Sequence, residues 1–183
     1  MEEVLPEGLR FIPEFITEAE ERDLVAAIEK IEFREIRMHG VVARRTSAHF
    51  GLDYDYDTFK LTPAQPQPAA FDPARERSAA LINVAAEDLV ETLVNRYPPG
   101  AAIGWHRDSP AFGVVVGVSL LSACRMRFQR GSGTARETAA LELPPRSAYV
   151  LDGPARTSWQ HSIPPARALR YSITFRTLRR GRP

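Results

Sequence analysis

The chain has 183 residues, 44% of them hydrophobic, and a formal net charge of +1 at pH 7. This length suits one domain with one core, so we expect residues 1–183 to fold as a single unit. The single cysteine, Cys124, excludes an internal disulfide, and no apolar run approaches the ~20 residues of a membrane span, so we expect a soluble, cytoplasmic protein.

Charge is unevenly distributed along the chain. Residues 1–37 carry a net charge of −6 and the remaining residues a net charge of +7, and only two of the 24 basic side chains are lysines. Arginine is suited to bidentate binding of phosphate and carboxylate groups. A nucleic-acid partner fits this basic body, although an arginine-rich genome composition gives the same picture.

The N-terminal part predicts an edge strand followed by a helix. Residues 9–15 are apolar and contain a proline, which is typical of an edge strand or extended segment. Thr17 and Glu20 have the spacing of a capping box, and apolar residues then recur at helical spacing. We therefore expect a helix over residues 17–31.

The next segment contains short strands, a loop and a second helix. Residues 33–56 include β-like stretches with glycines that suit turns, and residues 61–72 are proline-rich and almost uncharged. We interpret residues 61–72 as a long loop or lid edge. Asp72 as N-cap and Pro73 in the first turn predict a helix over residues 72–84.

From residue 93 onward the sequence is typical of strands. Eight runs are separated by Pro, Gly or Ser clusters, at residues 93–97, 102–108, 113–121, 124–130, 140–144, 147–153, 159–163 and 170–178. Several short strands at this spacing indicate a sandwich or barrel. We predict an α+β, mainly β fold: a double-stranded β-helix (jelly roll) with its core at residues 91–178 and the N-terminal helices packed on one sheet.

Three residues form a candidate metal site. His106 and Asp108 lie two residues apart in a strand-like run, so their side chains point the same way, and His161 is the candidate third ligand from another strand. Two histidines and one carboxylate on one face of an octahedron leave three positions open, as in non-haem Fe(II) oxygenases. For each histidine taken alone, a structural role would be the default.

A polar strand face begins nine residues after His161. It alternates with the apolar residues of the same run and consists of Arg170, Ser172, Thr174 and Arg176. Two arginines on an inward strand face need anions, and a dicarboxylate that chelates iron supplies them. The alternative is an exposed strand face with solvated arginines.

Asn95 and Tyr97 share a strand face about ten residues before His106. An amide and a phenol in the pocket could hydrogen-bond the same dicarboxylate, while an ordinary core position is the alternative for Tyr97.

The runs NRYPPGAAIGWHRD (95–108), SWQHSIPP (158–165) and RYSITFR (170–176) together resemble the AlkB family of Fe(II)/2-oxoglutarate-dependent dioxygenases. The resemblance covers residues 93–178.

The resemblance implies a role for each matching residue. The two histidines and the aspartate would bind Fe(II). Arg170 would pair with the distal carboxylate of 2-oxoglutarate and Arg176 would lie near its metal-bound end, with Asn95 and Tyr97 as hydrogen-bond partners. Dioxygen and 2-oxoglutarate would give succinate and carbon dioxide while an N-methyl group is oxidised and lost as formaldehyde.

The resemblance also implies that residues 35–72 form a lid over the substrate. Arg45, Tyr54 and Tyr56 align loosely with the segment that grips the nucleotide in the family, and they could stack a flipped base and hold its phosphates. An aromatic strand packed on the core is the alternative. Pro110 stands where DNA-repair members typically have an acidic residue.

The expected function is therefore oxidative demethylation of N-alkylated bases in DNA or RNA by a monomeric enzyme. A second hypothesis keeps the oxygenase chemistry and changes the substrate to a protein side chain or a small molecule. A third is a non-enzymatic jelly-roll binding module without functional iron.

Overall fold

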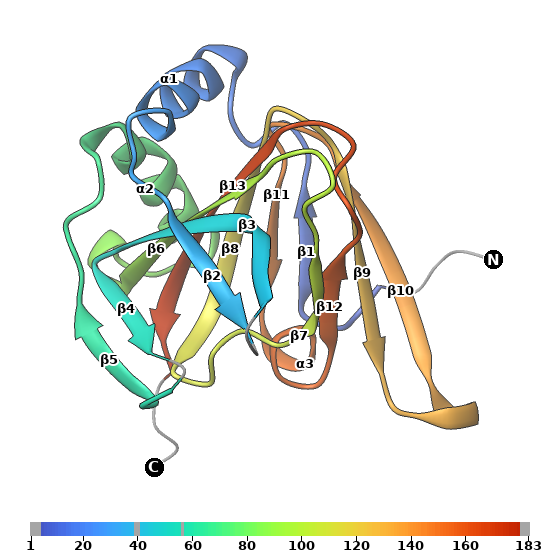
Figure 1. Ribbon diagram of the computed structural model, residues 1–183. Coiled ribbons are helices and arrows are strands. Elements are labelled where there is room, and N and C mark those ends of the chain that lie inside the picture. Colours follow the sequence, from blue (N-terminus) through green and yellow to red (C-terminus); the bar gives the residue numbers. More distant parts are fainter. Residues whose placement is uncertain (1–4, 39–40, 56, 180–183) are drawn as a thin grey trace.

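The structure is a computed structural model that describes residues 5–38, 41–55 and 57–179. Over these residues the strands form a seven-stranded sheet, a four-stranded sheet and a two-stranded hairpin (Figure 1). The two larger sheets face each other, and the two longer helices cover the outer side of the larger sheet (Figure 1). The predicted α+β, mainly β jelly roll with helices on one sheet is confirmed.

The strands are distributed between the sheets as follows. The larger sheet runs in the order β1 (Leu9–Ile12), β11 (Ala148–Leu151), β8 (Phe112–Leu120), β13 (Arg170–Leu178), β6 (Leu89–Tyr97), β3 (Val41–Phe50) and β2 (Arg34–Met38). The smaller sheet runs in the order β10 (Glu137–Leu143), β9 (Cys124–Arg130), β12 (Gln160–Ile163) and β7 (Ile103–His106). All eight strands expected after residue 93 are present, and β1 is an edge strand as predicted.

Helix α1 (Glu18–Ile28) begins with the predicted capping box. The Thr17 hydroxyl accepts from the backbone N–H of Glu20 over 3.2 Å, and the Glu20 carboxylate accepts from the backbone N–H of Thr17 over 2.7 Å. These bonds satisfy two amide donors that the first turn would leave without partners. The helix ends at Ile28, so the predicted end at residue 31 is one turn too late.

Helix α2 (Asp72–Leu81) does not have the predicted cap. A 3-10 turn at Ala69–Phe71 leads directly into it, so Phe71 is the N-cap and Asp72 lies within the helix. The Asp72 carboxylate instead accepts a hydrogen bond from Gln67 over 2.7 Å. The prediction of Asp72 as N-cap was therefore wrong, because the residues before it already turn helically. The short helix α3 (Gly153–Thr157) lies between β11 and β12.

The segment predicted as a loop contains a strand. Residues of β5 (Lys60–Pro63) pair antiparallel with β4 (Leu52–Asp55) to form a separate hairpin beside the larger sheet. Prolines are tolerated here because the hairpin has two free edges. Part of the expected loop 61–72 is thus a hairpin arm.

Strand β13 separates two apolar clusters. Its residues Tyr171, Ile173 and Phe175 pack against α1 and α2 on the outer face of the larger sheet. Its alternate residues point between the two sheets, where a second cluster contains Tyr97 and Tyr149. The polar face predicted for this strand therefore lies inside the jelly roll, with Arg170 1% exposed and Arg176 6% exposed.

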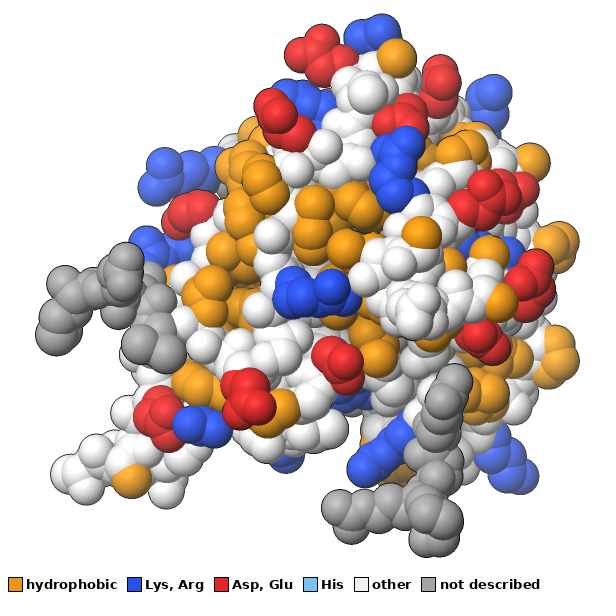
Figure 2. Space-filling view, turned by 180° about the vertical axis from the view of Figure 1, so that it is seen from behind, with side chains coloured by type: hydrophobic (Ala, Val, Ile, Leu, Met, Phe, Trp, Pro, Cys, Tyr) orange, Lys and Arg blue, Asp and Glu red, His pale blue; other side chains and the backbone are white. Residues whose placement is uncertain are grey.

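The surface carries mixed charges. On the face seen from behind, hydrophobic side chains gather in the middle and charged groups of both signs lie around them (Figure 2). Within the described residues, no helix combines the length and the apolar character that crossing a membrane requires.

Candidate metal and cosubstrate site

The three predicted metal ligands converge between the two sheets. His106 ends β7 and His161 lies on the neighbouring β12, where the two residues are register partners. Asp108 follows β7 in the next loop. The ligand atoms of the three side chains all lie within 4.8 Å of one another, which is close enough for a single ion.

The protonation of the triad suits a metal cation. The Nδ1 atom of His106 lies 2.8 Å from the Gly104 carbonyl, which can only accept, so Nδ1 carries the proton and Nε2 has a free lone pair. Burial lowers the pKa of His161 to about 4 and also lowers that of His106. Burial raises the pKa of Asp108, but Arg176 and the two imidazoles outweigh it and hold the pKa below its ordinary value. At neutral pH the site therefore offers two neutral imidazoles and one carboxylate.

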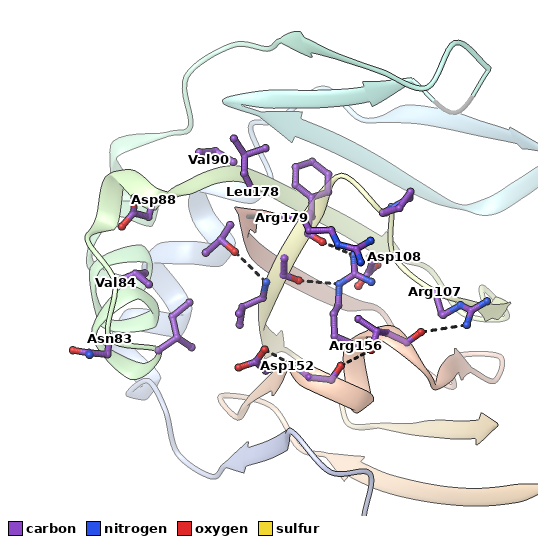
Figure 3. A pocket seen from close by; sticks show the side chains of 18 of the residues that line it. Asn83, Val84, Asp88, Val90, Arg107, Asp108, Asp152, Arg156, Leu178 and Arg179 are labelled. Atoms are coloured by element: carbon purple, nitrogen blue, oxygen red, sulfur yellow. Dashed lines mark hydrogen bonds between the residues drawn. The ribbon is translucent and has the colours of Figure 1, made fainter. Parts of the chain in front are cut away.

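Arg156 of α3 holds the loop that carries Asp108. Its guanidinium donates to the carbonyls of Ser109, Phe112 and Gly113. An open hollow of about 1150 Å³ adjoins this loop. Arg156 and Asp108 line one side of the hollow. Residues that follow α2, among them Asn83 and Asp88, line the other side (Figure 3). One of these hydrogen bonds is to the loop, at Ser109, and the other two are to the start of β8, where the loop ends. Together they limit the positions that the Asp108 carboxylate can take.

Arg176 lies beside the triad. Its Nη2 donates to Asp108 over 3.1 Å and its Nη1 donates to Glu91 over 2.7 Å. Glu91 on β6 also accepts from Nδ1 of His49 over 3.0 Å. The structure therefore brings Arg176 to the metal end of the pocket, with two carboxylates as partners.

Arg170 lies on the same strand face, further from the triad. Its guanidinium carbon is 5.1 Å from the ring centre of Tyr97, and its Nε donates to the Ser119 hydroxyl over 3.2 Å. Its buried Nη1 has no hydrogen-bond partner among the described residues. A buried cation without an anionic partner costs free energy, so this position fits the carboxylate of a ligand.

Asn95 is buried on the same inner face and is paired with Ser172. Its side-chain oxygen accepts from Arg45 Nη1 over 2.6 Å. Arg45 is only 9% exposed, and its charge is among the causes that lower the pKa of His106. The structure thus places Arg45, predicted as a substrate contact, beside Asn95, which is predicted for the cosubstrate.

The two tyrosines predicted to contact the substrate have different outcomes. Tyr54 on β4 is buried and its ring lies 6.5 Å from that of Phe112, edge to face. Phe112 in turn lies beneath the guanidinium of Arg176, at 5.6 Å. Tyr54 therefore contacts the wall of the site. Tyr56 lies outside the described residues.

Sequence reasoning missed two polar residues of the site. Glu91 is in phase with Asn95 and Tyr97 on β6, but the predicted strand began two residues too late to include it. Tyr149 pairs with Gly117, and a Cβ atom at Gly117 would lie 2.5 Å from the Tyr149 hydroxyl, so the glycine makes room for the phenol. Burial and the nearby Asp108 raise the pKa of Tyr149, so the phenol keeps its proton.

The donor set fits Fe(II) and 2-oxoglutarate. Two imidazoles and a carboxylate from strand and loop leave room for further ligands, as an oxygenase requires. Arg170, buried on the inner face of the larger sheet, has one terminal nitrogen without a hydrogen-bond partner among the described residues. A metal-chelating dicarboxylate would satisfy both features at once.

Comparison with known proteins identifies the same chemistry. Residues 8–176 match the family model described as the 2OG-Fe(II) oxygenase superfamily. The chain is 32% identical over 182 residues to the Arabidopsis thaliana alkylated DNA repair protein ALKBH8 homolog, covering 86% of this chain and 51% of that protein. It is 30% identical over 157 residues to the Mus musculus DNA oxidative demethylase ALKBH2, covering 78% and 64%. The chain thus spans about half of the first relative and less than two thirds of the second.

A solved structure supports the fold. The structure of OsALKBH1 superposes with a TM-score of 0.70 at 14% sequence identity, covering 95% of this chain and 98% of that chain. At this identity the likeness concerns the fold alone.

Proposed function

Because the chain belongs to the 2OG-Fe(II) oxygenase superfamily, we propose that it is an Fe(II)- and 2-oxoglutarate-dependent dioxygenase that oxidatively demethylates N-alkylated bases in DNA or RNA. The predicted resemblance to the AlkB family is confirmed by its ALKBH8 and ALKBH2 relatives. The superfamily uses Fe(II), 2-oxoglutarate and dioxygen, which agrees with the predicted cofactors.

The observation that carries the proposal is the convergent triad together with Arg170, whose buried Nη1 has no hydrogen-bond partner among the described residues and which shares an inner strand face with Arg176 beside the triad. In the proposed roles, the triad of His106, Asp108 and His161 binds the metal, and Arg170 binds the distal carboxylate of 2-oxoglutarate. When bound, iron and 2-oxoglutarate supply the oxidising chemistry, and the cosubstrate leaves as succinate and carbon dioxide. The protein's own contribution is to hold these largely buried side chains in fixed positions around the metal and the cosubstrate.

The other side chains of the inner face have proposed roles around that cosubstrate. Asn95 and Tyr97 are its proposed hydrogen-bond partners, and Arg176 is proposed to lie near its metal-bound end. Arg45, Tyr54 and Tyr56 are proposed to face the substrate, within a lid formed by residues 35–72 of a single domain. The contact of Arg45 with Asn95 would then connect the substrate to the cosubstrate pocket.

Nucleic acid is the proposed substrate class for two reasons. The ALKBH2 relative is named as a DNA oxidative demethylase and the ALKBH8 homolog as an alkylated DNA repair protein. In addition, Trp105 precedes a triad residue and is 39% exposed, with the guanidinium carbon of Arg127 5.3 Å from its ring centre. Exposed aromatic and arginine side chains are the groups on which single-stranded bases stack.

A turnover assay tests the proposal directly. The protein, loaded with Fe(II), is incubated with 2-oxoglutarate and a panel of methylated DNA and RNA oligonucleotides, and succinate, formaldehyde and the demethylated base are measured. We expect stoichiometric formation of all three for at least one oligonucleotide. Succinate formation that is indifferent to every methylated oligonucleotide would contradict the proposed substrate and favour a protein side chain or a small molecule. Monomeric state and cytoplasmic location stay predictions.

A further inference from the structure

A series of hydrogen bonds and ion pairs, buried at Glu91 and Arg176, runs from the metal site to Asp53 of β4. Asp108 accepts from Arg176 over 3.1 Å, and Arg176 donates to Glu91 over 2.7 Å. Glu91 accepts from His49 over 3.0 Å, and His49 also lies 3.4 Å from Asp53 on β4. These contacts therefore connect a proposed metal ligand to His49 and Asp53 of the proposed lid through Glu91, which has no place in the proposed reaction.

Glu91 is an unusual residue for a β-strand interior. Its side chain is completely buried. One carboxylate oxygen faces Arg176 and the other faces His49. Burial raises the pKa of this carboxyl, but Arg176 and His49 outweigh it and lower the pKa below its usual value, so Glu91 is ionised. A buried carboxylate is retained only where its partners compensate the loss of hydration, so its position depends on these two contacts.

Arg176 is shared between two carboxylates. Its side chain is 8% exposed, and each of its two terminal nitrogens donates to one acid, Glu91 or Asp108. If Asp108 were the only acid paired with this guanidinium, the positive charge of Arg176 would weaken the electrostatic attraction between the Asp108 carboxylate and a divalent cation. Glu91 supplies the compensating charge at the far side of the same guanidinium.

We propose that Glu91 is a positioning residue that sets the charge at the metal centre by neutralising Arg176, and so raises metal affinity. This inference rests on the proposed function only in taking Asp108 as a metal ligand. Groups that contact a ligand residue, as Arg176 contacts Asp108, commonly change metal affinity by about 10–100-fold when they are replaced. Glu91 acts through Arg176, one contact further from the ligand, so we expect its effect at the lower end of this range. His49 fixes the other oxygen of Glu91 and so keeps the carboxylate turned toward Arg176.

The test is the substitution Glu91→Gln, with Mn(II) as a redox-stable probe and 2-oxoglutarate as the second ligand. Gln keeps the shape of the side chain and removes its charge, so the net positive charge beside the triad rises by one. We expect the Kd for Mn(II) to rise by about tenfold. With Mn(II) saturating, the Kd for 2-oxoglutarate, a dianion, should stay the same or fall.

These opposite effects distinguish charge from packing. A merely structural defect would weaken both ligands together and lower the melting temperature, and that outcome would overturn the proposal. A rise in the Mn(II) Kd of less than about threefold, well short of the usual effect of such residues, would also overturn it, and any larger rise without loss of 2-oxoglutarate binding supports it.

Two further variants complete the experiment. Glu137→Gln removes the acid of the exposed Arg130–Glu137 ion pair on β9 and β10, and we expect neither Kd to change.

Glu91→Asp keeps the charge but shortens the side chain. It should lower the melting temperature and keep the Mn(II) Kd within about threefold of wild type. Should Glu91→Gln fail to fold, loss of Mn(II) binding in Glu91→Asp beyond that limit would overturn the proposal. None of these readouts requires demethylase activity, so a failed oligonucleotide assay leaves the test intact.

Discussion

His106 and His161 are register partners on β7 and β12, and their ring centres lie 4.3 Å apart. The two residues are far apart in sequence, and the antiparallel pairing of these strands places both imidazoles on the same face. Asp108 then reaches the pair from the loop that Arg156 holds. Because two ligands lie on paired strands and the third on a fixed loop, little side-chain freedom has to be lost when a metal binds.

Substituting His161 by Ala is expected to remove metal binding without unfolding the protein. The imidazole is one of the three donors that lie within 4.8 Å of one another, and two donors hold a divalent ion far less tightly than three. We expect the Kd for Fe(II) or Mn(II) to rise by about two orders of magnitude or more. Isothermal titration measures the affinity and far-UV circular dichroism checks the fold. Metal binding at wild-type affinity would exclude His161 as a ligand.

Substituting Arg170 by Met is expected to weaken 2-oxoglutarate binding and leave the ligand-free protein at least as stable as wild type. The guanidinium is fully buried and its Nη1 has no partner among the described residues. Loss of a charge-assisted hydrogen bond costs about 1.5–3 kcal/mol, which is a rise in Kd of about 10–150-fold. Removal of an uncompensated buried charge is often neutral or stabilising.

The matched control is Arg96→Met, because Arg96 is on the neighbouring strand β6 and its side chain is exposed. It should leave the 2-oxoglutarate Kd and the melting temperature unchanged. A large drop in melting temperature for Arg170→Met would mean that Arg170 is a structural residue with its own partners. Equal losses of affinity in both variants would point to a general charge effect.

The sequence predicted the parts of the fold that depend on local pattern. Alternation along residues 170–176 correctly separated Arg170 and Arg176 from Tyr171 and Phe175, because strand side chains alternate between faces. The Thr17–Glu20 capping box was also correct, since it involves only neighbours in sequence. The convergence of His106 and Asp108 could be predicted because they lie two residues apart in the chain, while His161 was predicted from the need for a third ligand on another strand.

Other features that depend on pairing between distant strands carry no signal in either segment and could not be predicted. Tyr149 enters the pocket because Gly117 is opposite it on β8, and nothing in either segment alone indicates that partnership. The burial of Glu91 depends in the same way on Arg176 and His49, which reach it from β13 and β3. Asp72 was misassigned because a preceding 3-10 turn, which has no strong sequence signal, moved the helix start.

Replacing Glu20 by Gln is expected to lower stability in a pH-dependent manner. The carboxylate accepts two hydrogen bonds from Arg77 of α2, at 2.6 and 3.0 Å, and one from the Thr17 amide. Its hydrogen bonds with Arg77, and then with the Thr17 backbone, lower the pKa of Glu20 from 4.5 to about 2. The stabilisation is therefore complete above pH 4.5 and is lost as the pH falls toward 2.

Solvent screening reduces the size of this effect, since the Arg77 side chain is 42% exposed. We expect a loss of about 1 kcal/mol in the free energy of unfolding at pH 7. Urea unfolding of both proteins between pH 7 and pH 3 measures it, and the difference should shrink toward the acid end. A difference that is constant over this range would mean that the Glu20 charge makes no contribution.

Replacing Trp105 by Ala is expected to weaken oligonucleotide binding and to leave the cosubstrate pocket unchanged. The indole is 39% exposed, immediately precedes His106, and lies against Arg127, whose Nε donates to Ser162 over 3.2 Å. A nucleobase stacked on an aromatic side chain contributes about 1–3 kcal/mol, so we expect the oligonucleotide Kd to rise by about 5–150-fold. Trp105→Phe should retain most of the affinity, because stacking needs a ring and not an indole N–H. Fluorescence anisotropy of a labelled single strand at low salt measures binding, and the 2-oxoglutarate Kd checks the pocket.

Leu121→Ala, which removes another exposed apolar side chain of 41% exposure, should change neither constant. If Trp105→Ala bound the strand like wild type, the bases would have to stack elsewhere, and the region of Arg45 and Tyr54 would be the next place to substitute.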